Sequence, residues 1–380
     1  MDIERLVALS EQNIRVWLSR ATGRPLIAPH TVQVNFTFDC NLTCKMCGMD
    51  EQKRFLRERG KQLEIDSETI RKVIRESKEL GARMVLFLGG EPFLRSDLFD
   101  LLRYAKEHDL LTGVVTNGTL LDEETRLKCV EGGLDCLSVS IDGASEEVVG
   151  GIRGSGVLGT IIENIEALNR LKKEKGKQVP SIISVCTIMD DNLEELPAVA
   201  ALSRKLGMDR AIFQPVVVDN TDQTLRDREG SKSIPPARLK VLDQGIDSLL
   251  RYKTSSRENF DFISNSVEHL RLIKRYFRGQ VTPRELPCYA GFTRVQVVQT
   301  GKMYFCVNQN EHEAVFGDIK EQTLKEMWFS KEASAYRELI RDCKAPCLQY
   351  CSLRVDDGEW TGMWRKAFLP RSVTTGGASK

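Results

Sequence analysis

Three cysteines lie close together near the beginning of the chain, in the stretch FTFDCNLTCKMCGMD. They are Cys40, Cys44 and Cys47, separated by three and then two residues. A structural zinc ion takes four protein ligands, and no fourth cysteine or histidine lies near Cys47; the nearest candidate, His30, precedes a predicted strand. Three thiolates on a cubane [4Fe–4S] cluster leave one iron open to another ligand. The spacing therefore predicts a cluster whose open iron binds a further molecule.

The remaining cysteines form a second group near the end of the chain or lie alone. The second group consists of Cys288, Cys306, Cys343, Cys347 and Cys351. The first residues, MDIERLVALSEQ, do not resemble a secretory signal, so the 11 cysteines are expected to bind metal rather than form disulfides. Cys129, Cys136 and Cys186 stand apart in apolar surroundings and are expected to be buried.

Short β-rich runs alternate with amphipathic helical stretches from residue 31 onward. The expected strands span 32–38, 84–88, 112–116, 136–141, 181–188 and 210–216. Apolar spacing predicts helices between them, among them 66–80, capped by Asp66 or Ser67 and stopped by Gly81, and 160–175. This alternation predicts an α/β fold with a parallel sheet and right-handed crossovers. Six units are too few to close an eight-stranded barrel, so we expect a partial (β/α)6 TIM-like barrel or an open sheet.

Glycines and polar residues follow four successive strands of this predicted sheet. The first strand leads into the three-cysteine loop and the second into Gly89, Gly90, Glu91 and Pro92; the next two end at Asn117 and in the stretch 140–143. Ligands of such folds bind at the C-terminal ends of the strands. Turn formation explains any one of these loops, but four of them beside a cysteine cluster predict a rim that binds a polar ligand.

The combination of Cys40-x3-Cys44-x2-Cys47 with GGEP at 89–92 and SIDG at 140–143 resembles the radical S-adenosylmethionine (SAM) superfamily. The resemblance covers residues 31–220. It implies that the amino and carboxylate groups of SAM bind the open iron of a [4Fe–4S] cluster. Reductive cleavage of SAM then gives methionine and a 5′-deoxyadenosyl radical, which abstracts hydrogen from the substrate.

The same resemblance implies the residues that contact SAM. The backbone carbonyls of Gly89, Gly90 and Pro92 and the carboxylate of Glu91 would accept hydrogen bonds from the SAM ammonium. The matching positions that follow are Asn117 at the rim, and Ser140 and Arg153 near the methionyl carboxylate or ribose. For Arg153 the alternative is an isolated surface arginine; Asp142 is expected only to close a turn, and Phe38 and Met46 only to pack.

The second cysteine group resembles the SPASM/twitch extension of radical SAM enzymes. Residues 293–298 and 302–307 alternate like a hairpin around Thr300-Gly301, and the segment GDIKEQTLKEMWFS follows. The full SPASM pattern has seven cysteines and two auxiliary clusters, whereas this chain has five cysteines there. We expect one auxiliary [4Fe–4S] cluster on Cys288, Cys306 and two of the final three cysteines, with zinc as the alternative. If all its irons are bound by protein, it serves electron transfer or structure.

These patterns divide the chain into five predicted segments. They are an N-terminal helix at 1–30, the radical SAM partial barrel at 31–220, a loop and helical linker at 221–285, a small α+β iron–sulfur domain at 286–355 and a tail at 356–380.

Composition excludes several classes of partner. With 55 basic and 54 acidic side chains the chain lacks the basic excess expected of a nucleic-acid-binding protein. No apolar run approaches the roughly 20 residues of a membrane span. A cytoplasmic protein is expected.

Three functions fit these predictions. The first is an enzyme that abstracts hydrogen from an unactivated C–H bond of a small or medium metabolite, such as a sugar, lipid or amino-acid derivative, with an external flavodoxin- or ferredoxin-type electron donor. The second is a maturase of a ribosomally made peptide, which forms a cross-link or thioether or epimerises a residue; the shortness of the segment before the barrel counts against it. The third is a non-catalytic iron–sulfur sensor, which would not need the SAM-binding rim. The first is preferred.

Overall fold

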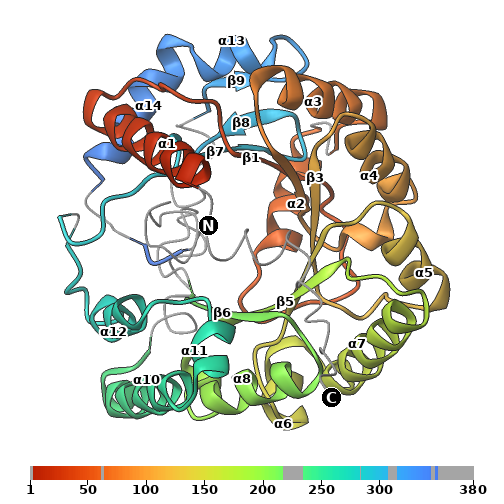
Figure 1. Ribbon diagram of the computed structural model, residues 1–380, viewed down its shortest axis with the longest axis vertical. Helices are drawn as coiled ribbons and strands as arrows, with labels where there is room; N and C mark the ends of the chain where they lie inside the picture. The colour runs from red at the N-terminus through yellow and green to blue at the C-terminus, as the bar shows by residue number, and fades with distance from the viewer. Residues whose placement is uncertain are drawn as a thin grey trace, which may run out of the picture.

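The computed structural model describes residues 3–60, 64–216, 234–282, 284–306, 315–343 and 347–349. Within these ranges a nine-stranded sheet forms the centre of the molecule, and helices lie around its outer side (Figure 1). The strand order is β6-β5-β4-β3-β2-β1-β7-β8-β9. Cys351, most of the predicted polar loop after residue 216 and the tail lie outside the described residues.

The first six strands confirm the predicted partial barrel. They are β1 (Thr31–Asn35), β2 (Met84–Leu88), β3 (Leu111–Thr116), β4 (Cys136–Ser140), β5 (Ser181–Ile188) and β6 (Arg210–Pro215). Each pairs in parallel with the next along the chain. The fold is therefore α/β, with the C-terminal ends of all six strands at one edge of the sheet.

Most of the connecting helices cover the outer side of this sheet, whereas α2 (Met49–Glu58) lies inside the arc of strands in Figure 1. Their bounds are α1 (Ile3–Thr22), α2 (Met49–Glu58), α3 (Ser67–Leu80), α4 (Leu98–Glu107), α5 (Glu123–Glu131), α6 (Glu146–Arg153), α7 (Val157–Glu174) and α8 (Leu196–Lys205). Further along lie α10 (Leu239–Thr254), α11 (Arg257–Phe262), α12 (Val267–Tyr276), α13 (Leu324–Trp328) and α14 (Lys331–Arg341). Short 3-10 turns are η1 (Pro92–Leu94), η2 (Asp190–Asn192) and η4 (Pro236–Arg238). No helix in the described ranges is both long enough and apolar enough to cross a membrane.

Helix α3 shows how local sequence sets these boundaries. The Asp66 carboxylate accepts a hydrogen bond from the Thr69 amide and so caps the first turn. Gly81 ends the helix with a φ of 99°, a left-handed conformation that favours glycine. Ile70 and Ile74 are buried against the sheet. Both the start and the end of this helix agree with the sequence prediction.

The C-terminal hairpin extends the barrel sheet. Strand β7 (Arg294–Val297) pairs in parallel with β1, and β8 (Lys302–Tyr304) and β9 (Gly317–Asp318) follow in antiparallel order. The hairpin itself was predicted, but its addition to β1 was not. The pairing occupies the backbone groups of β1 that would otherwise form an exposed sheet edge. The predicted iron–sulfur segment thus lies directly beside the strand that leads to Cys40 (Figure 1).

The two faces of the sheet differ in composition. Val32, Val34 and Phe87 pack with helical residues in the main core. Because side chains alternate along a strand, their neighbours point to the opposite face, called here the inner face. There Met84, Cys136, Ile183 and Ile212 form a separate cluster of strand residues at the N-terminal ends of the strands.

Glycine at position 113 shows that this apolar part of the inner face is filled. A Cβ atom there would lie 2.6 Å from both Leu86 Cδ1 and Met84 Cε. Toward the C-terminal ends of the strands the same face becomes polar: by alternation it carries Asn35, Ser140, Thr187 and Gln214. The polar end of the inner face is therefore the end that meets the loops with the predicted site residues.

Candidate active site

The loop after β1 brings the first three cysteines together. The Cys47 amide donates to the Cys44 carbonyl over 3.0 Å, and the Lys45 amide donates to the Ile152 carbonyl over 2.9 Å, which ties the loop to α6. Cys40 and Cys44 are half-buried and Cys47 is exposed. Burial raises the pKa of the Cys40 and Cys44 thiols, and the proximity of Cys47 raises both further. The three thiols therefore lie in one neighbourhood of the loop, where each would disfavour ionisation of the others in the absence of a metal.

Gly89 and Gly90 allow the β2 loop to pack directly on the chain that leads to Cys40. A Cβ atom on Gly89 would lie 2.5 Å from the Thr37 carbonyl oxygen, and one on Gly90 would lie 2.1 Å from the Asp39 carbonyl oxygen. The Gly90 amide donates to the Thr37 carbonyl and the Glu91 amide to the Asp39 carbonyl, each over 2.7 Å. The two glycines therefore fix the approach of the backbone to the cysteine loop.

Glu91 is fully buried, and its carboxylate joins two rim loops. It accepts hydrogen bonds from the Thr116 hydroxyl and the Asn117 amide over 2.8 Å each, and from the Phe93 amide over 3.3 Å. Burial raises the pKa of Glu91, while these donors favour its ionised form. The carboxylate oxygens of Glu91 are thus directed toward the end of β3 and the loop that follows it. Pro92, also buried, begins the turn η1.

Asn117 links the rim to the first cysteine. Its amide nitrogen Nδ2 donates to Asn41 Oδ1 over 2.9 Å and lies 3.9 Å from Cys40 Sγ. Its Oδ1 accepts from the Thr119 amide and hydroxyl. Hydrogen bonds to ligand sulfurs tune iron–sulfur clusters, so an N–H donor at this distance fits a cluster bound through Cys40.

Arg153 forms a buried ion pair instead of lying on the surface. Its Nε and Nη2 lie 2.8 and 2.5 Å from Asp142 Oδ2, and the Arg153 and Asp142 side chains are 8% and 0% exposed. Asp142 Oδ1 accepts from the Thr187 amide over 2.7 Å. Burial acts to lower the pKa of Arg153, but Asp142 and Cys44 outweigh it and raise the pKa. From the sequence, Asp142 was expected only to close a turn, because its partner Arg153 lies 11 residues further along the chain.

The free end of this guanidinium reaches the cysteine loop. Arg153 Nη1 lies 3.6 Å from Cys44 Sγ. Ser140 is the last residue of β4, half-buried on the inner face. Phe38 is buried, and Met46 packs against Ile152, Met189 and Val216, as expected of packing residues. Of the predicted SAM-contact residues, the structure brings Asn117 and Arg153 to the cysteine sulfurs.

The second cysteine group also converges. Cys347, Cys306 and Cys343 all lie close enough to Cys288 to raise its pKa, in addition to the larger effect of burial. The Arg20 guanidinium donates to the Cys288 carbonyl over 2.9 Å, and the Tyr336 hydroxyl contacts the backbone of Cys306. The Leu348 carbonyl, next to Cys347, lies within hydrogen-bonding distance of the His269 ring. Gln349 Nε2 donates a hydrogen bond to the Pro215 carbonyl. These four cysteines come from three parts of the chain and lie in the same region beside the sheet, although the described residues are not arranged as a ready metal site; Cys351 lies outside the described residues.

Comparison with known proteins identifies the family. A model of the radical SAM superfamily matches residues 34–202, and a model of the SPASM iron–sulfur cluster-binding domain matches residues 288–352. An AdoMet-dependent heme synthase of Methanosarcina barkeri is 31% identical over 329 residues, which cover 82% of this chain and 85% of the relative. The chain belongs to the radical SAM superfamily.

Two further similarities add to this result. A PqqA peptide cyclase of Gluconobacter oxydans is 24% identical over 306 residues, covering 79% of this chain and 76% of the relative. The crystal structure of Streptococcus suis SuiB bound to precursor peptide SuiA matches with a TM-score of 0.62 at 14% identity, over 85% of this chain and 69% of that chain. The latter confirms the fold. As a radical SAM enzyme with a SPASM domain, the protein uses SAM, a SAM-binding [4Fe–4S] cluster and auxiliary iron–sulfur binding, as predicted.

Proposed function

We propose that this radical SAM enzyme is a maturase that modifies a ribosomally made peptide. The metabolite hypothesis was preferred on sequence grounds, but the name of the PqqA peptide cyclase favours its alternative. Cys40, Cys44 and Cys47 would hold the cluster, which would supply the electron for the cleavage of SAM; an external flavodoxin- or ferredoxin-type donor would provide that electron.

The residues of the rim would hold SAM over the cysteine loop. The carbonyls of Gly89 and Gly90 would accept hydrogen bonds from the SAM ammonium, and Ser140 and Arg153 would contact the methionyl carboxylate or ribose. Glu91 has an indirect role: it accepts a hydrogen bond from the backbone amide of Asn117 and so positions the Asn117 side chain, which reaches Cys40. In this proposal Asp142 is a positioning residue as well, because it orients the guanidinium that meets Cys44.

The structural observation that supports a peptide is a set of buried polar side chains on the inner face. Gln33 of β1 and Gln296 of β7 are register partners and are 8% and 1% exposed. Asn35 Nδ2 donates to the Tyr304 hydroxyl over 3.0 Å. A carboxamide offers both donors and an acceptor, the same pattern that a peptide bond presents. These side chains therefore suit a ligand with peptide groups and disfavour an apolar metabolite such as a lipid; the name of the PqqA peptide cyclase, and not these side chains, favours a peptide over a sugar or amino-acid derivative.

The test is product analysis after anaerobic reconstitution. The enzyme is incubated with SAM, dithionite and the short peptides encoded beside its gene, and the peptides are examined by mass spectrometry. The proposal expects 5′-deoxyadenosine together with a peptide that has lost two hydrogen atoms, or has an inverted residue. The variant Gln296→Leu should raise the KM for that peptide while its iron content stays at the wild-type level. If 5′-deoxyadenosine forms and no peptide changes, the peptide proposal fails.

A second candidate rests on the heme synthase relative, whose sequence identity is 31%. In this alternative the substrate is an iron porphyrin. Titration of the reconstituted enzyme with iron porphyrin distinguishes the two, since specific binding shifts the porphyrin absorption band. A saturable shift, with porphyrin-dependent formation of 5′-deoxyadenosine, would favour this candidate over the peptide.

A further inference from the structure

Arg294, the first residue of β7, is half-buried, and no acidic side chain of the described residues forms an ion pair with it. Its Nε is inaccessible to solvent and has no hydrogen-bond partner. Among the described residues it forms no ion pair and no side-chain hydrogen bond, in contrast to Arg153, which pairs with Asp142. An N–H group that is cut off from water and lacks a partner is costly, so an acceptor or counter-charge is expected beside it. Arg294 therefore suits an anion that the described side chains do not provide as a carboxylate.

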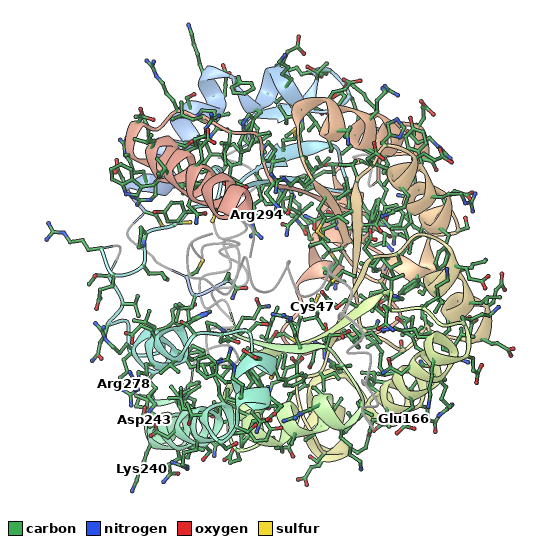
Figure 2. The ribbon with its side chains drawn as sticks, in the orientation of Figure 1. Cys47, Glu166, Lys240, Asp243, Arg278 and Arg294 are labelled. Carbon is green, nitrogen blue, oxygen red and sulfur yellow. The ribbon has the colours of Figure 1, made fainter. Side chains whose placement is uncertain are left out.

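The strand register places this guanidinium beside the second cysteine group. In the antiparallel pair Gln296 faces Tyr304 and Val297 faces Met303. Continued by two residues, the same register sets Arg294 opposite Cys306, with both side chains on the inner face. The groups that favour the charged form of Arg294 are Cys288, Cys347, Cys306 and Tyr304, whereas burial acts against it and lowers the pKa of Arg294 to about 10. Figure 2 shows Arg294 on the inner side of the ring of strands.

Iron–sulfur ligation would supply the missing anion. Cysteines bind iron as thiolates, and four of them on a cubane give the cluster a net negative charge that increases by one when it is reduced. A guanidinium against the ligand sulfurs stabilises the more negative, reduced state. We propose that Arg294 is the counter-ion of the auxiliary cluster and raises its reduction potential. The proposal rests on the ligand role that the sequence predicts for Cys288 and Cys306.

The experiment isolates the auxiliary cluster in the full-length chain. Cys40→Ala, Cys44→Ala and Cys47→Ala are combined, the protein is reconstituted anaerobically, and iron and sulfide are counted. Reductive titration followed by electron paramagnetic resonance is then carried out with Arg294 intact and with Arg294→Gln, Arg294→Met or Arg294→Lys. Arg271→Gln removes a charge from a side chain that is 65% exposed and controls for a change in net charge.

The expected result depends on charge. At one fixed potential, Arg294→Gln and Arg294→Met should lower the ratio of reduced to oxidised cluster by at least about tenfold, which is about 59 mV for a one-electron couple. In Arg294→Lys and Arg271→Gln, this ratio should stay close to its value in the protein with Arg294 intact. Loss of the cluster from Arg294→Gln and Arg294→Met but not from Arg294→Lys would also support the proposal, because it shows that the cluster needs the charge.

Other outcomes overturn it. A fully loaded Arg294→Gln cluster with an unchanged potential shows that Arg294 is not its counter-ion. The same conclusion follows if that variant loses only peptide binding, which would assign the guanidinium to a substrate carboxylate. Loss of the cluster from Arg294→Lys as well shows that charge is not the decisive property. If no auxiliary iron is found even with Arg294 intact, the proposed ligand set fails first, and that result is distinct from the others.

Discussion

The ion pair between Arg153 and Asp142 gives the sharpest prediction about stability. Replacement of Asp142 by asparagine keeps the size of the side chain and removes its charge. The guanidinium then loses the carboxylate that lies 2.8 Å from Nε and 2.5 Å from Nη2. Because Arg153 is only 8% exposed, water cannot take the place of this partner.

The expected cost follows from this burial. Removal of one partner from a buried ion pair destabilises a protein by about 3–5 kcal/mol. The pair Lys45–Asp191 serves as a matched control, since its nitrogen and oxygen are 2.7 Å apart but its side chains are 44% and 29% exposed. Such an exposed pair contributes about 0–1 kcal/mol. Asp142→Asn should therefore cost several times more than Asp191→Asn.

Urea unfolding of the iron-free, reduced proteins measures this difference. A third variant, Asp142→Leu combined with Arg153→Met, replaces the pair with apolar side chains and should recover part of the lost stability; the rest stays lost because the Thr187 amide no longer has its acceptor. After reconstitution that double variant should nevertheless bind less iron at the first site, because the N–H donor to Cys44 is gone. If Asp142→Asn unfolds within about 1 kcal/mol of the wild type, the buried pair does not have the role assigned to it.

Two further predictions concern the rim and the barrel base. Gly90→Ala places a Cβ 2.1 Å from the Asp39 carbonyl oxygen and should displace the cysteine loop, with loss of iron from the first site; Gly159→Ala, in open space on α7, should retain full iron content and slightly raise stability. Equal iron in both variants would contradict the packing argument. Burial, with a smaller effect of Arg83, lowers the pKa of His30 from 6.5 to about 4. Between these values the unfolded chain binds more protons, so stability should rise with pH from about 4 to 6.5. In His30→Gln, the urea midpoint of unfolding should depend less on pH over this range. An unchanged pH dependence would contradict the role assigned to His30.

The barrel could be predicted because its signals are local. Alternating β-rich runs and amphipathic helices, with Asp66 as cap and Gly81 as stop, depend on neighbouring residues. The parallel pairing of β7 with β1 joins residues more than 250 positions apart, for example Thr31 with Arg294. Nothing in either strand specifies this partner, so the sequence predicted the hairpin and not its place in the sheet.

The site likewise combines features that the sequence predicted with features that only the fold reveals. The cysteine spacing predicted a cluster because [4Fe–4S] clusters are held by cysteine thiolates, whereas the side chains that contact these cysteines could not be predicted. Asp142 follows a strand and precedes a glycine, which is typical of a turn; only the fold brings Arg153 to it. Glu91 was predicted to face SAM, and its full burial against Thr116 and Asn117 becomes visible only once β2 and β3 are neighbours.

The substrate was the least accessible property. The rim loops carry SAM chemistry that does not depend on what is modified, and they gave no reason to prefer a peptide. The polar side chains Gln33, Asn35 and Gln296 gather only when β1 and β7 pair. Such residues, scattered in the sequence, are ordinary strand positions until the sheet is known.

The central claim is that three cysteines hold a cluster whose open iron receives SAM. The most direct measurement is the formation of 5′-deoxyadenosine by the anaerobically reconstituted protein with SAM, in the presence and absence of dithionite. We predict formation that requires the reductant and is abolished when Cys40, Cys44 and Cys47 are replaced by alanine. Purification of the air-free protein with zinc bound at these cysteines, and no 5′-deoxyadenosine after reconstitution, would contradict the account.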